Sequence, residues 1–243
     1  MIKAVLTGHS KGLGLGIAQS LLARGYPVLG LSRSIHAELQ KQFPTLLQQL
    51  PVDLAEHAAL QELLVGEALP EFMANATQLL LINNAGLVSP IGPLSVQPAS
   101  DISRSMQLNV TTPLVLSAHI TQLLKVDQQL RVLHVSSGAG RSAYPGWSVY
   151  CASKAALDMH AQATQLDKLE QVRICSLAPG VIDTDMQAQI RDTDEALFPN
   201  KKRFEELKST QQLSSPKQTG ERLVDYLLSP KFGSLAVDDL RSH

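Results

Sequence analysis

Short apolar runs alternate along this chain with longer stretches in which apolar residues recur at helical spacing. The apolar runs predict buried β-strands at residues 2–6, 28–31, 79–82, 132–135 and 172–177, with a weaker candidate at 46–52, where two glutamines interrupt the run. The periodic stretches predict helices at residues 13–24, 55–73, 101–126 and 148–169. Strands that alternate with helices of this length are typical of βαβ units, so we expect a parallel sheet covered by helices on both faces.

The chain shows no internal repeat, low-complexity segment or linker that would divide it. We therefore expect residues 1–243 to form one α/β domain, a doubly wound parallel sheet of the Rossmann type. Residues 183–215 contain no clear strand and are rich in charged and polar residues. A long insertion of this kind in an α/β enzyme is usually functional or mobile, and we expect a substrate lid there.

Composition excludes several classes of protein. Hydrophobic residues make up 44% of the chain and charged residues 18%, and the formal net charge of -1 favours neither nucleic acid nor an anionic membrane as a partner. The two cysteines form no disulfide framework, no apolar run approaches the length of a membrane span, and the first strand follows Met1 directly, so we expect a cytoplasmic protein. The seven histidines show no paired spacing typical of metal ligands, and we expect no metal site.

A glycine-rich turn lies between the first predicted strand and the first predicted helix. Gly8 permits a tight turn, Gly12 allows the backbone to approach a pyrophosphate, and Gly14 allows the helix to pack closely on the strand. The helix N-terminus that follows offers unpaired N–H groups and a positive dipole to an anion. In this position between strand and helix, the turn predicts a dinucleotide-binding site rather than a purely structural turn.

Tyr150 and Lys154 stand four residues apart in a predicted helix, which places both side chains on one face. A free phenol has a pKa of about 10, and a neighbouring ammonium favours the phenolate. A serine hydroxyl at Ser137 would hold a substrate oxygen while the tyrosine exchanges a proton with it. Ser136 is the competing candidate, but adjacent residues of an extended segment point in opposite directions, and we expect Ser136 to face away.

These motifs together resemble the short-chain dehydrogenase/reductase family. The resemblance rests on Thr7 with the glycine turn, on Asn83 to Gly86 after the predicted strand at 79–82, on Ser137 with the Tyr150–Lys154 pair, and on Pro179-Gly180 with Thr184. It implies about seven parallel strands and hydride exchange with a nicotinamide cofactor. It also implies that Tyr150 is the general acid, that Ser137 orients the carbonyl, that Lys154 assists Tyr150, and that Asn109 interrupts its helix and anchors a water leading to the lysine.

The end of the second predicted strand indicates which nicotinamide cofactor is used. Enzymes that use NAD usually carry an acidic residue there, whereas this chain has Ser32 followed by Arg33. Arg33 and Lys11 are suited to a 2′-phosphate, which favours NADP(H). Asp53 either holds the adenine amino group, as the resemblance implies, or caps the helix that starts near Glu56. The cofactor contacts that the resemblance implies are Gly8, Ser10, Lys11, Gly12, Leu13, Gly14, Arg33, Asp53, Asn84, Ala85, Gly86, Asn109, Tyr150, Lys154, Pro179, Gly180, Val181 and Thr184.

The substrate end of the site is less clearly defined. Several stretches are most similar to bacterial benzil reductases, relatives of sepiapterin reductase, and this resemblance implies a 1,2-dicarbonyl substrate. Trp147 either stacks on a flat substrate or packs within its loop, and Met186 and Phe198 of the lid would form an apolar wall. Asp238 resembles the aspartate that anchors the pterin in sepiapterin reductases, although acidic residues near a terminus are usually solvated.

The sequence therefore predicts an NADPH-dependent carbonyl reductase that acts on one carbonyl of a diketone. The alternatives are a sepiapterin or pterin reductase and a non-catalytic NADP(H)-binding redox sensor, because a fold alone does not determine function. The resemblance also implies a homodimer or homotetramer paired through the helices predicted at 101–126 and 148–169.

Overall fold

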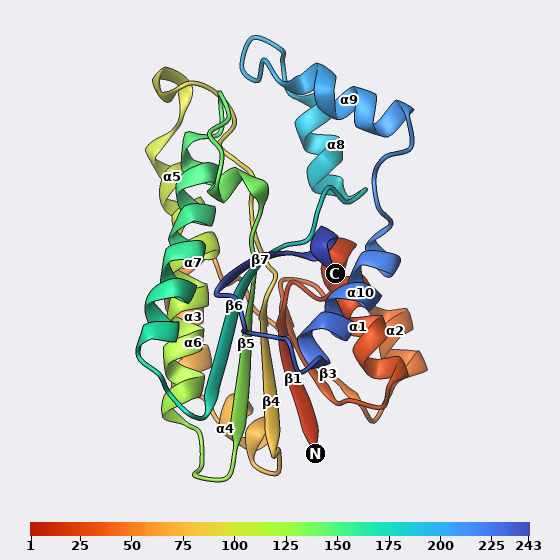
Figure 1. The fold of residues 1–243 in the computed structure, drawn as a ribbon, viewed down its shortest axis with the longest axis vertical. Helices are drawn as coiled ribbons and strands as arrows, with labels where there is room; N and C mark the ends of the chain where they lie inside the picture. Colours follow the sequence, from red (N-terminus) through yellow and green to blue (C-terminus); the bar gives the residue numbers. More distant parts are fainter.

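Seven parallel strands form one sheet in the order β3-β2-β1-β4-β5-β6-β7 (Figure 1). The computed structural model describes all residues from 1 to 243. The strands are β1 (Ile2–Thr7), β2 (Val28–Ser32), β3 (Leu47–Pro51), β4 (Gln78–Asn83), β5 (Gln129–Val135), β6 (Val172–Ala178) and β7 (Val237–Asp239). The direction of strand order reverses between β1 and β4, and ligands of open parallel sheets bind at the carboxyl ends of the strands beside such a reversal.

Helices cover both faces of the sheet (Figure 1). One face carries α1 (Gly12–Ala23), α2 (Ala37–Gln42) and α10 (Pro216–Leu228), and the other carries α3 (His57–Val65), α4 (Ala68–Met73), α5 (Ala99–Met106), α6 (Thr112–Gln122) and α7 (Ser148–Leu166). Two large groups of buried hydrophobic residues, of 23 and 18 members, fill the two layers between helices and sheet. None of the helices combines the length and the apolar character that crossing a membrane requires.

The six strands predicted from apolar runs are confirmed, including the weak candidate that became β3. Helix boundaries differ more. The helix predicted at 55–73 is broken at Gly66, so that α3 and α4 are separate, and the helix predicted at 101–126 contains a π-helical turn at Gln107–Thr111 between α5 and α6. Outside the expected lid, three elements were not located in advance: α2, α10 and β7. Short 3₁₀ turns lie at Leu94–Val96, Gly138–Gly140 and Leu240–Ser242.

The segment predicted as a lid stands above the carboxyl edge of the sheet (Figure 1). It contains α8 (Asp185–Asp192) and α9 (Lys201–Ser209). Its two ends are joined at the base by a parallel bridge between Ile182 and Ser214, with the Asp183 N–H donating to the Ser214 carbonyl at 3.0 Å. The chain therefore leaves the sheet and returns to the same place, and α8 and α9 extend from that base.

Candidate active site

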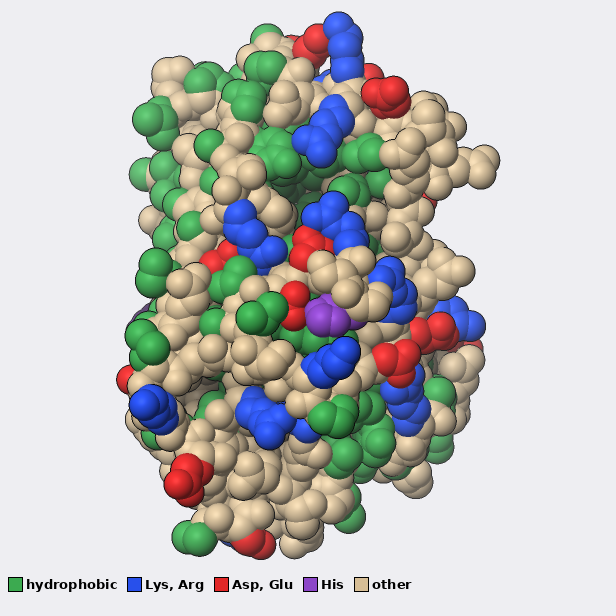
Figure 2. Space-filling model, in the orientation of Figure 1, with side chains coloured by type: hydrophobic (Ala, Val, Ile, Leu, Met, Phe, Trp, Pro, Cys, Tyr) green, Lys and Arg blue, Asp and Glu red, His purple; other side chains and the backbone are tan.

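A cavity of about 580 Å³ lies at the carboxyl ends of the strands, beneath α8 and α9. Figure 2 shows this face hollowed below the lid, with hydrophobic side chains inside the hollow and Lys and Arg side chains on its rim. Most residues that the sequence singled out line this cavity: Gly8, Ser10, Lys11, Gly12, Leu13, Gly14, Arg33, Asp53, Asn84, Ala85, Gly86, Ser137, Trp147, Tyr150, Lys154, Pro179, Gly180, Val181, Thr184 and Met186. Asn109 and Asp238 do not line it.

The glycine turn forms a tight cradle in front of α1. Gly8 and Gly12 have φ angles of +71° and +54°, and a Cβ added at Gly14 would lie 2.0 Å from the Gly8 carbonyl oxygen. No side chain caps the N-terminus of α1, and its first turn holds no acidic residue. Free backbone N–H groups and the positive end of the helix dipole therefore face the cavity, as pyrophosphate binding requires.

Thr7, at the end of β1, fixes the loop after β4 against this cradle. Its hydroxyl accepts hydrogen bonds from the backbone N–H groups of Asn84 and Ala85, each at 2.9 Å. The Asn84 side chain in turn donates to the carbonyl oxygens of Thr7 and Gly8 at 2.9 and 3.2 Å. The two loops at the topological reversal are therefore held as one surface.

Charged side chains surround the end of the cavity near β2. Arg33 is exposed and forms no ion pair, and no carboxylate follows β2. Lys11 forms an ion pair with Asp185 of α8 at 2.9 Å, with both side chains mostly exposed. Asp53 is not the N-cap of α3, which is Glu56. Asp53 accepts hydrogen bonds from the Ala55 N–H and from Arg104, at 3.0 and 2.6 Å, and these hold its pKa below the usual value although partial burial opposes the charge.

Tyr150 and Lys154 lie on consecutive turns of α7, and both are buried, with 7% and 5% of their surfaces exposed. The Lys154 ammonium is 5.7 Å from the centroid of the Tyr150 ring and donates to the Val135 carbonyl oxygen at 2.8 Å. Burial raises the pKa of Tyr150 to about 12, and a hydrogen bond with Ser137 only partly offsets this. Burial also lowers the pKa of Lys154 to about 8, against the opposing charge of Asp158.

These pKa values differ from the sequence prediction that Lys154 lowers the pKa of Tyr150. The reason is that the site removes both groups from water, so the neutral phenol is favoured more strongly than the ammonium can oppose. The ammonium is also directed to a backbone carbonyl instead of the phenol oxygen. Tyr150 is therefore protonated at neutral pH.

Ser136 and Ser137 face different surroundings, as expected for adjacent extended residues. The Ser136 hydroxyl donates to Asp158 at 2.7 Å, and the Ser176 hydroxyl donates to the same carboxylate oxygen at 2.6 Å. Arg141 pairs with the second oxygen of Asp158 at 3.1 Å. This buried polar group anchors the end of β5, and it leaves the Ser137 hydroxyl beside Tyr150 on the cavity wall.

Asn109 lies in the π-helical turn and is buried. Its side chain pairs with the backbone of Leu87, accepting from the N–H at 2.8 Å and donating to the carbonyl oxygen at 2.7 Å. A Cβ added at Gly86 would lie 3.3 Å from Asn109 Oδ1 and 3.7 Å from Lys154 Nζ, so the amide and the ammonium converge on this glycine. The helix interruption expected at Asn109 is present, and it brings the amide to the loop that borders Lys154.

The substrate end of the cavity is aromatic. Trp147 is 4% exposed and stacks on Phe198, with ring centroids 4.7 Å apart and an interplanar angle of 20°. Its ring also lies 5.3 Å from those of Tyr144 and Tyr150 and 5.4 Å from that of Phe204. Trp147 therefore packs against aromatic residues of its own loop, of α7 and of the lid, and it also forms part of the cavity wall. Phe198 is fully buried and does not line the cavity.

The lid contributes wall residues that the sequence analysis did not identify. Helical spacing carried a signal for them, because Ile190 follows Met186 by four residues and Leu207 follows Phe204 by three. Without the fold, nothing indicated which face of α8 or α9 meets the cavity. The residues missed on this side are Gln187, Gln189, Ile190, Arg203, Phe204 and Leu207, and near β2 they include Ser34 and Arg104.

Asp238 fits neither interpretation made from the sequence, because it is neither solvated nor on the cavity wall. It is buried in β7, and its Oδ2 accepts from the Tyr226 hydroxyl at 2.7 Å and contacts His243 Nε2 at 2.9 Å. Its Oδ1 accepts from the Asp239 N–H at 2.8 Å. Burial opposes the charged form, but hydrogen bonds within the protein hold the pKa of Asp238 below the usual value. Both carboxylate oxygens are thus occupied away from the cavity.

Comparison with known proteins identifies the family. A family model described as short chain dehydrogenase matches residues 3–195. A benzil reductase ((S)-benzoin forming) of Bacillus cereus is 34% identical over 241 residues, covering 94% of each chain. A sepiapterin reductase of Bos taurus is 32% identical over 250 residues, covering 97% of this chain and 92% of that one. A solved short-chain dehydrogenase/reductase of Burkholderia vietnamiensis is 41% identical, with a TM-score of 0.73 and coverage of 99% and 97%.

The chain belongs to the short-chain dehydrogenase family. It is an oxidoreductase of the type that acts on carbonyl or alcohol groups with a nicotinamide cofactor. The cavity fits such a cofactor, because the uncapped helix and the glycine cradle are suited to its pyrophosphate. Thr184 lies beside this cradle, since its Cγ2 is 3.4 Å from the Cβ position of Gly12.

Proposed function

We propose that the protein is an NADPH-dependent carbonyl reductase that reduces one carbonyl of an aromatic 1,2-dicarbonyl compound. The observation that supports this most directly is the arrangement of Ser137, Tyr150 and Lys154. All three line the cavity that also contains the phosphate cradle, and the pKa of Tyr150 is held at about 12 by burial. A neutral phenol beside a serine hydroxyl is equipped to protonate an oxygen that gains negative charge.

The residues of the chain account for positioning and proton transfer. A bound nicotinamide would supply the hydride. Ser137 donates a hydrogen bond to the carbonyl oxygen and so orients the carbonyl carbon toward the hydride donor. Tyr150 gives its proton to the same oxygen as the carbon–hydrogen bond forms, which leaves an alcohol and a phenolate. Lys154, buried and cationic below pH 8, stabilises that phenolate until a proton returns from solvent.

The preference for NADPH is supported by charge near the end of β2. Ser32 directs its hydroxyl to the Ser34 carbonyl oxygen at 2.6 Å, and no carboxylate is present there to bind a ribose hydroxyl pair. Arg33 has no acidic partner and is available to a 2′-phosphate. Lys11 would have to leave Asp185 before it could contribute, so Arg33 is the principal phosphate ligand in this proposal.

The preference for an aromatic dicarbonyl is supported by the wall next to Tyr150. Tyr144, Trp147 and Phe204 provide flat apolar surfaces, and Met186 and Ile190 complete the lid side. Aromatic rings pack well on such surfaces. The similarity to proteins named benzil reductase points to the same class of substrate. A pterin substrate is less well supported, because Asp238 does not reach the cavity.

The test is oxidation of NADPH and NADH by the purified protein with benzil, 1-phenyl-1,2-propanedione, sepiapterin and acetophenone. We expect NADPH and the diketones to be used in preference, and Tyr150→Phe to lower kcat/KM by about 10³-fold, the range typical for loss of a general acid. A double variant, Ser32→Asp with Arg33→Ala, should shift the preference toward NADH.

Three results would contradict the proposal. Faster turnover of sepiapterin than of any diketone would favour a pterin reductase. Tight NADPH binding with no turnover of any carbonyl would favour a redox sensor. Unchanged NADPH preference in the double variant would show that Ser32 and Arg33 do not select the cofactor.

A further inference from the structure

The cationic side chains of the cavity divide into those with acidic partners and those without. Three are neutralised: Lys11 by Asp185 at 2.9 Å, Arg104 by Asp53 at 2.6 Å, and Arg241 by Asp239 at 2.6 Å. Three have no carboxylate partner, and they are Lys154, Arg33 and Arg203. The cavity therefore offers cationic groups without an ion-pair partner at three places.

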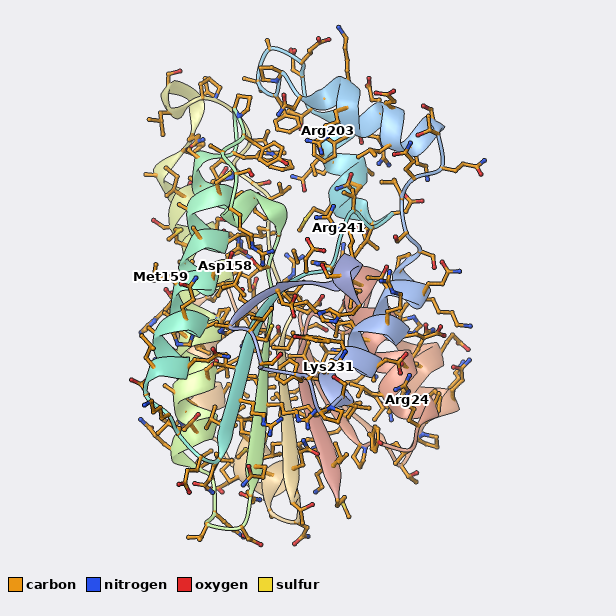
Figure 3. The ribbon with its side chains drawn as sticks, in the orientation of Figure 1. Arg24, Asp158, Met159, Arg203, Lys231 and Arg241 are labelled. Carbon is orange, nitrogen blue, oxygen red and sulfur yellow. The ribbon has the colours of Figure 1, made fainter.

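Two of these three charges already have a role in the proposed function. Lys154 is buried at the reacting centre, and Arg33 follows β2 at the cofactor end. Arg203 lies elsewhere, on α9 of the lid, where Figure 3 places it above the cleft and across from Arg241. No part of the reaction described so far uses Arg203.

The surroundings of Arg203 set it apart from the other cations of its helix. Each lysine of α9 has an acidic partner: Lys201 with Glu205 at 3.8 Å, Lys202 with Glu195 at 2.9 Å and Lys208 with Asp183 at 2.5 Å. Arg203 has none. Its Nη1 instead donates to the Tyr144 hydroxyl at 3.5 Å, and its guanidinium lies 6.0 Å from the centroid of the Tyr144 ring.

Tyr144 connects Arg203 with the catalytic centre. The Tyr144 ring lies 5.3 Å from that of Trp147, which lies 5.3 Å from that of Tyr150. An aromatic substrate whose carbonyl is at Tyr150 would therefore extend along this wall toward the guanidinium. An arginine fork in this place matches the two oxygens of a carboxylate, and the weakly hydrated guanidinium gives up water readily.

We propose that Arg203 binds a carboxylate on the part of the substrate remote from the reacting carbonyl, so that the preferred substrates are aromatic carbonyl compounds that carry an acid group. This inference rests on the proposed reductase function. It extends that function by assigning an acid group to the preferred substrate. Arg203 acts here as a specificity residue, and it takes no part in proton transfer.

The first test compares benzil with its 3-carboxy and 4-carboxy derivatives in the wild type, Arg203→Met and Arg203→Lys. Lys202→Met is the matched control, since Lys202 is the neighbouring cation on α9 and is paired with Glu195. We expect Arg203→Met to lower kcat/KM for at least one carboxylated substrate by about tenfold, the effect typical of one charge-assisted contact, and to change benzil by less than about twofold. Arg203→Lys should fall between, and Lys202→Met should match the wild type.

Equal losses for benzil and both acids in Arg203→Met would show a general effect on the lid and would overturn the proposal. Unchanged values for all three substrates would overturn it as well. If the wild type turns over no carbonyl compound, the proposed reductase function fails, and the role of Arg203 is then decided by binding.

The binding test uses Trp147, the only tryptophan of the chain, as a fluorescent probe. Nitroaromatic compounds quench tryptophan, so the protein with NADP⁺ is titrated with 4-nitrobenzoate and with nitrobenzene. We expect saturable quenching by 4-nitrobenzoate that weakens about tenfold in Arg203→Met, with nitrobenzene unaffected. Equal affinity of the wild type and Arg203→Met for 4-nitrobenzoate would overturn the proposal independently of any turnover.

Discussion

Phe198 attaches the lid to the rest of the protein, and replacing it with alanine should release α8 and α9 while the sheet remains folded. The ring is fully buried, stacks on Trp147 at 4.7 Å and packs against Phe204 at 5.6 Å. These three belong to a group of seven buried residues that is separate from the two large cores on the sheet. The lid is therefore stabilised by a small apolar cluster of its own.

The expected increase in lid opening depends on the contacts that still hold the lid to the rest of the protein after the Phe198 ring is removed. Truncating a buried phenylalanine to alanine costs about 3–5 kcal/mol, and we take about 3 kcal/mol because the lid is able to settle into the gap. The remaining side-chain ties include the exposed ion pair of Lys11 with Asp185, worth at most about 1 kcal/mol. A loss of about 3 kcal/mol corresponds to an approximately 100-fold larger population of the open lid.

The assay is amide hydrogen exchange followed by peptide. In Phe198→Ala, amides of α8 and α9 should exchange up to about 100-fold faster, whereas those of β1 and β4 should keep their wild-type rates. Fluorescence of Trp147 should shift to longer wavelength as its ring becomes hydrated. The matched control is Phe232→Ala, because Phe232 is 1% exposed and packs on Tyr226 within the larger core.

The control should lower the Tm of the whole protein and accelerate exchange in the sheet, with no selective effect on the lid. If Phe198→Ala instead lowers the global Tm as much as Phe232→Ala does, with no preferential exchange in α8 and α9, the lid is not held independently and the reasoning is refuted.

Three further predictions concern single side chains. Ser137→Ala should lower kcat/KM for diketones by about 100-fold, as for loss of one oxyanion donor, and should lower Tm only slightly, since the hydroxyl also accepts a hydrogen bond from the Ala139 N–H at 3.2 Å. Ser136→Ala, which removes a donor from buried Asp158, should mainly lower stability, by about 1–3 kcal/mol. A reversed pattern in kinetics and melting would show that the two serines are misassigned. Because burial lowers the pKa of Lys154 to about 8, kcat/KM for reduction should be constant below pH 7 and fall above about pH 8; a pH–rate profile that stays level to pH 9.5 would contradict this. Burial, with smaller contributions from His160 and Lys154, lowers the pKa of His134 from 6.5 to about 3. Between pH 7 and pH 5 the unfolded chain therefore binds a proton that the folded chain does not, and the free energy of unfolding should fall by about 2 kcal/mol. Urea melts should show a smaller fall for His134→Gln, whereas an equal fall would show that His134 is not the cause.

The parts of the fold that could be predicted from the sequence are those specified by local pattern. Each of the six predicted strands is an apolar run that can be located from its own residues, and all six appear where expected. β7 has only three residues, and it exists because Ser176, Leu177 and Ala178 of β6 pair with it. Such a short strand is defined by its partner, so no pattern within residues 237–239 identifies it.

Two helix errors have different origins. The break at Gly66 depends on a single residue, which the apolar periodicity across 55–73 concealed. α10 did carry a start signal, because Ser215 caps the helix by accepting from the Gln218 N–H at 3.1 Å and Pro216 follows at the first position. The expected lid ends at Ser215, so the start of α10 beside it was missed.

The candidate site likewise has properties that the local sequence determines and properties that depend on the folded surroundings. The spacing of Tyr150 and Lys154 is a local property of one helix, and the structure places both in the cavity. Their pKa values are not local, because they depend on how completely the surrounding elements exclude water. The environment of Asp238 could not be predicted from the sequence for the same reason. Its hydrogen-bond partner Tyr226 lies on α10, and two acidic residues near the end of the chain give no indication of that contact.

The π-helical turn at Gln107–Thr111 makes the length of the chain between α5 and α6 part of the active site. A π turn is equivalent to one residue inserted into an α-helix. Deleting one residue there would let a regular helix run from α5 into α6, but each position after the deletion would be rotated by about 100°. Either Asn109 would lose its paired hydrogen bonds with Leu87, or α6 would turn its apolar face away from the sheet. This segment should therefore tolerate many changes of residue type and very few changes of residue number.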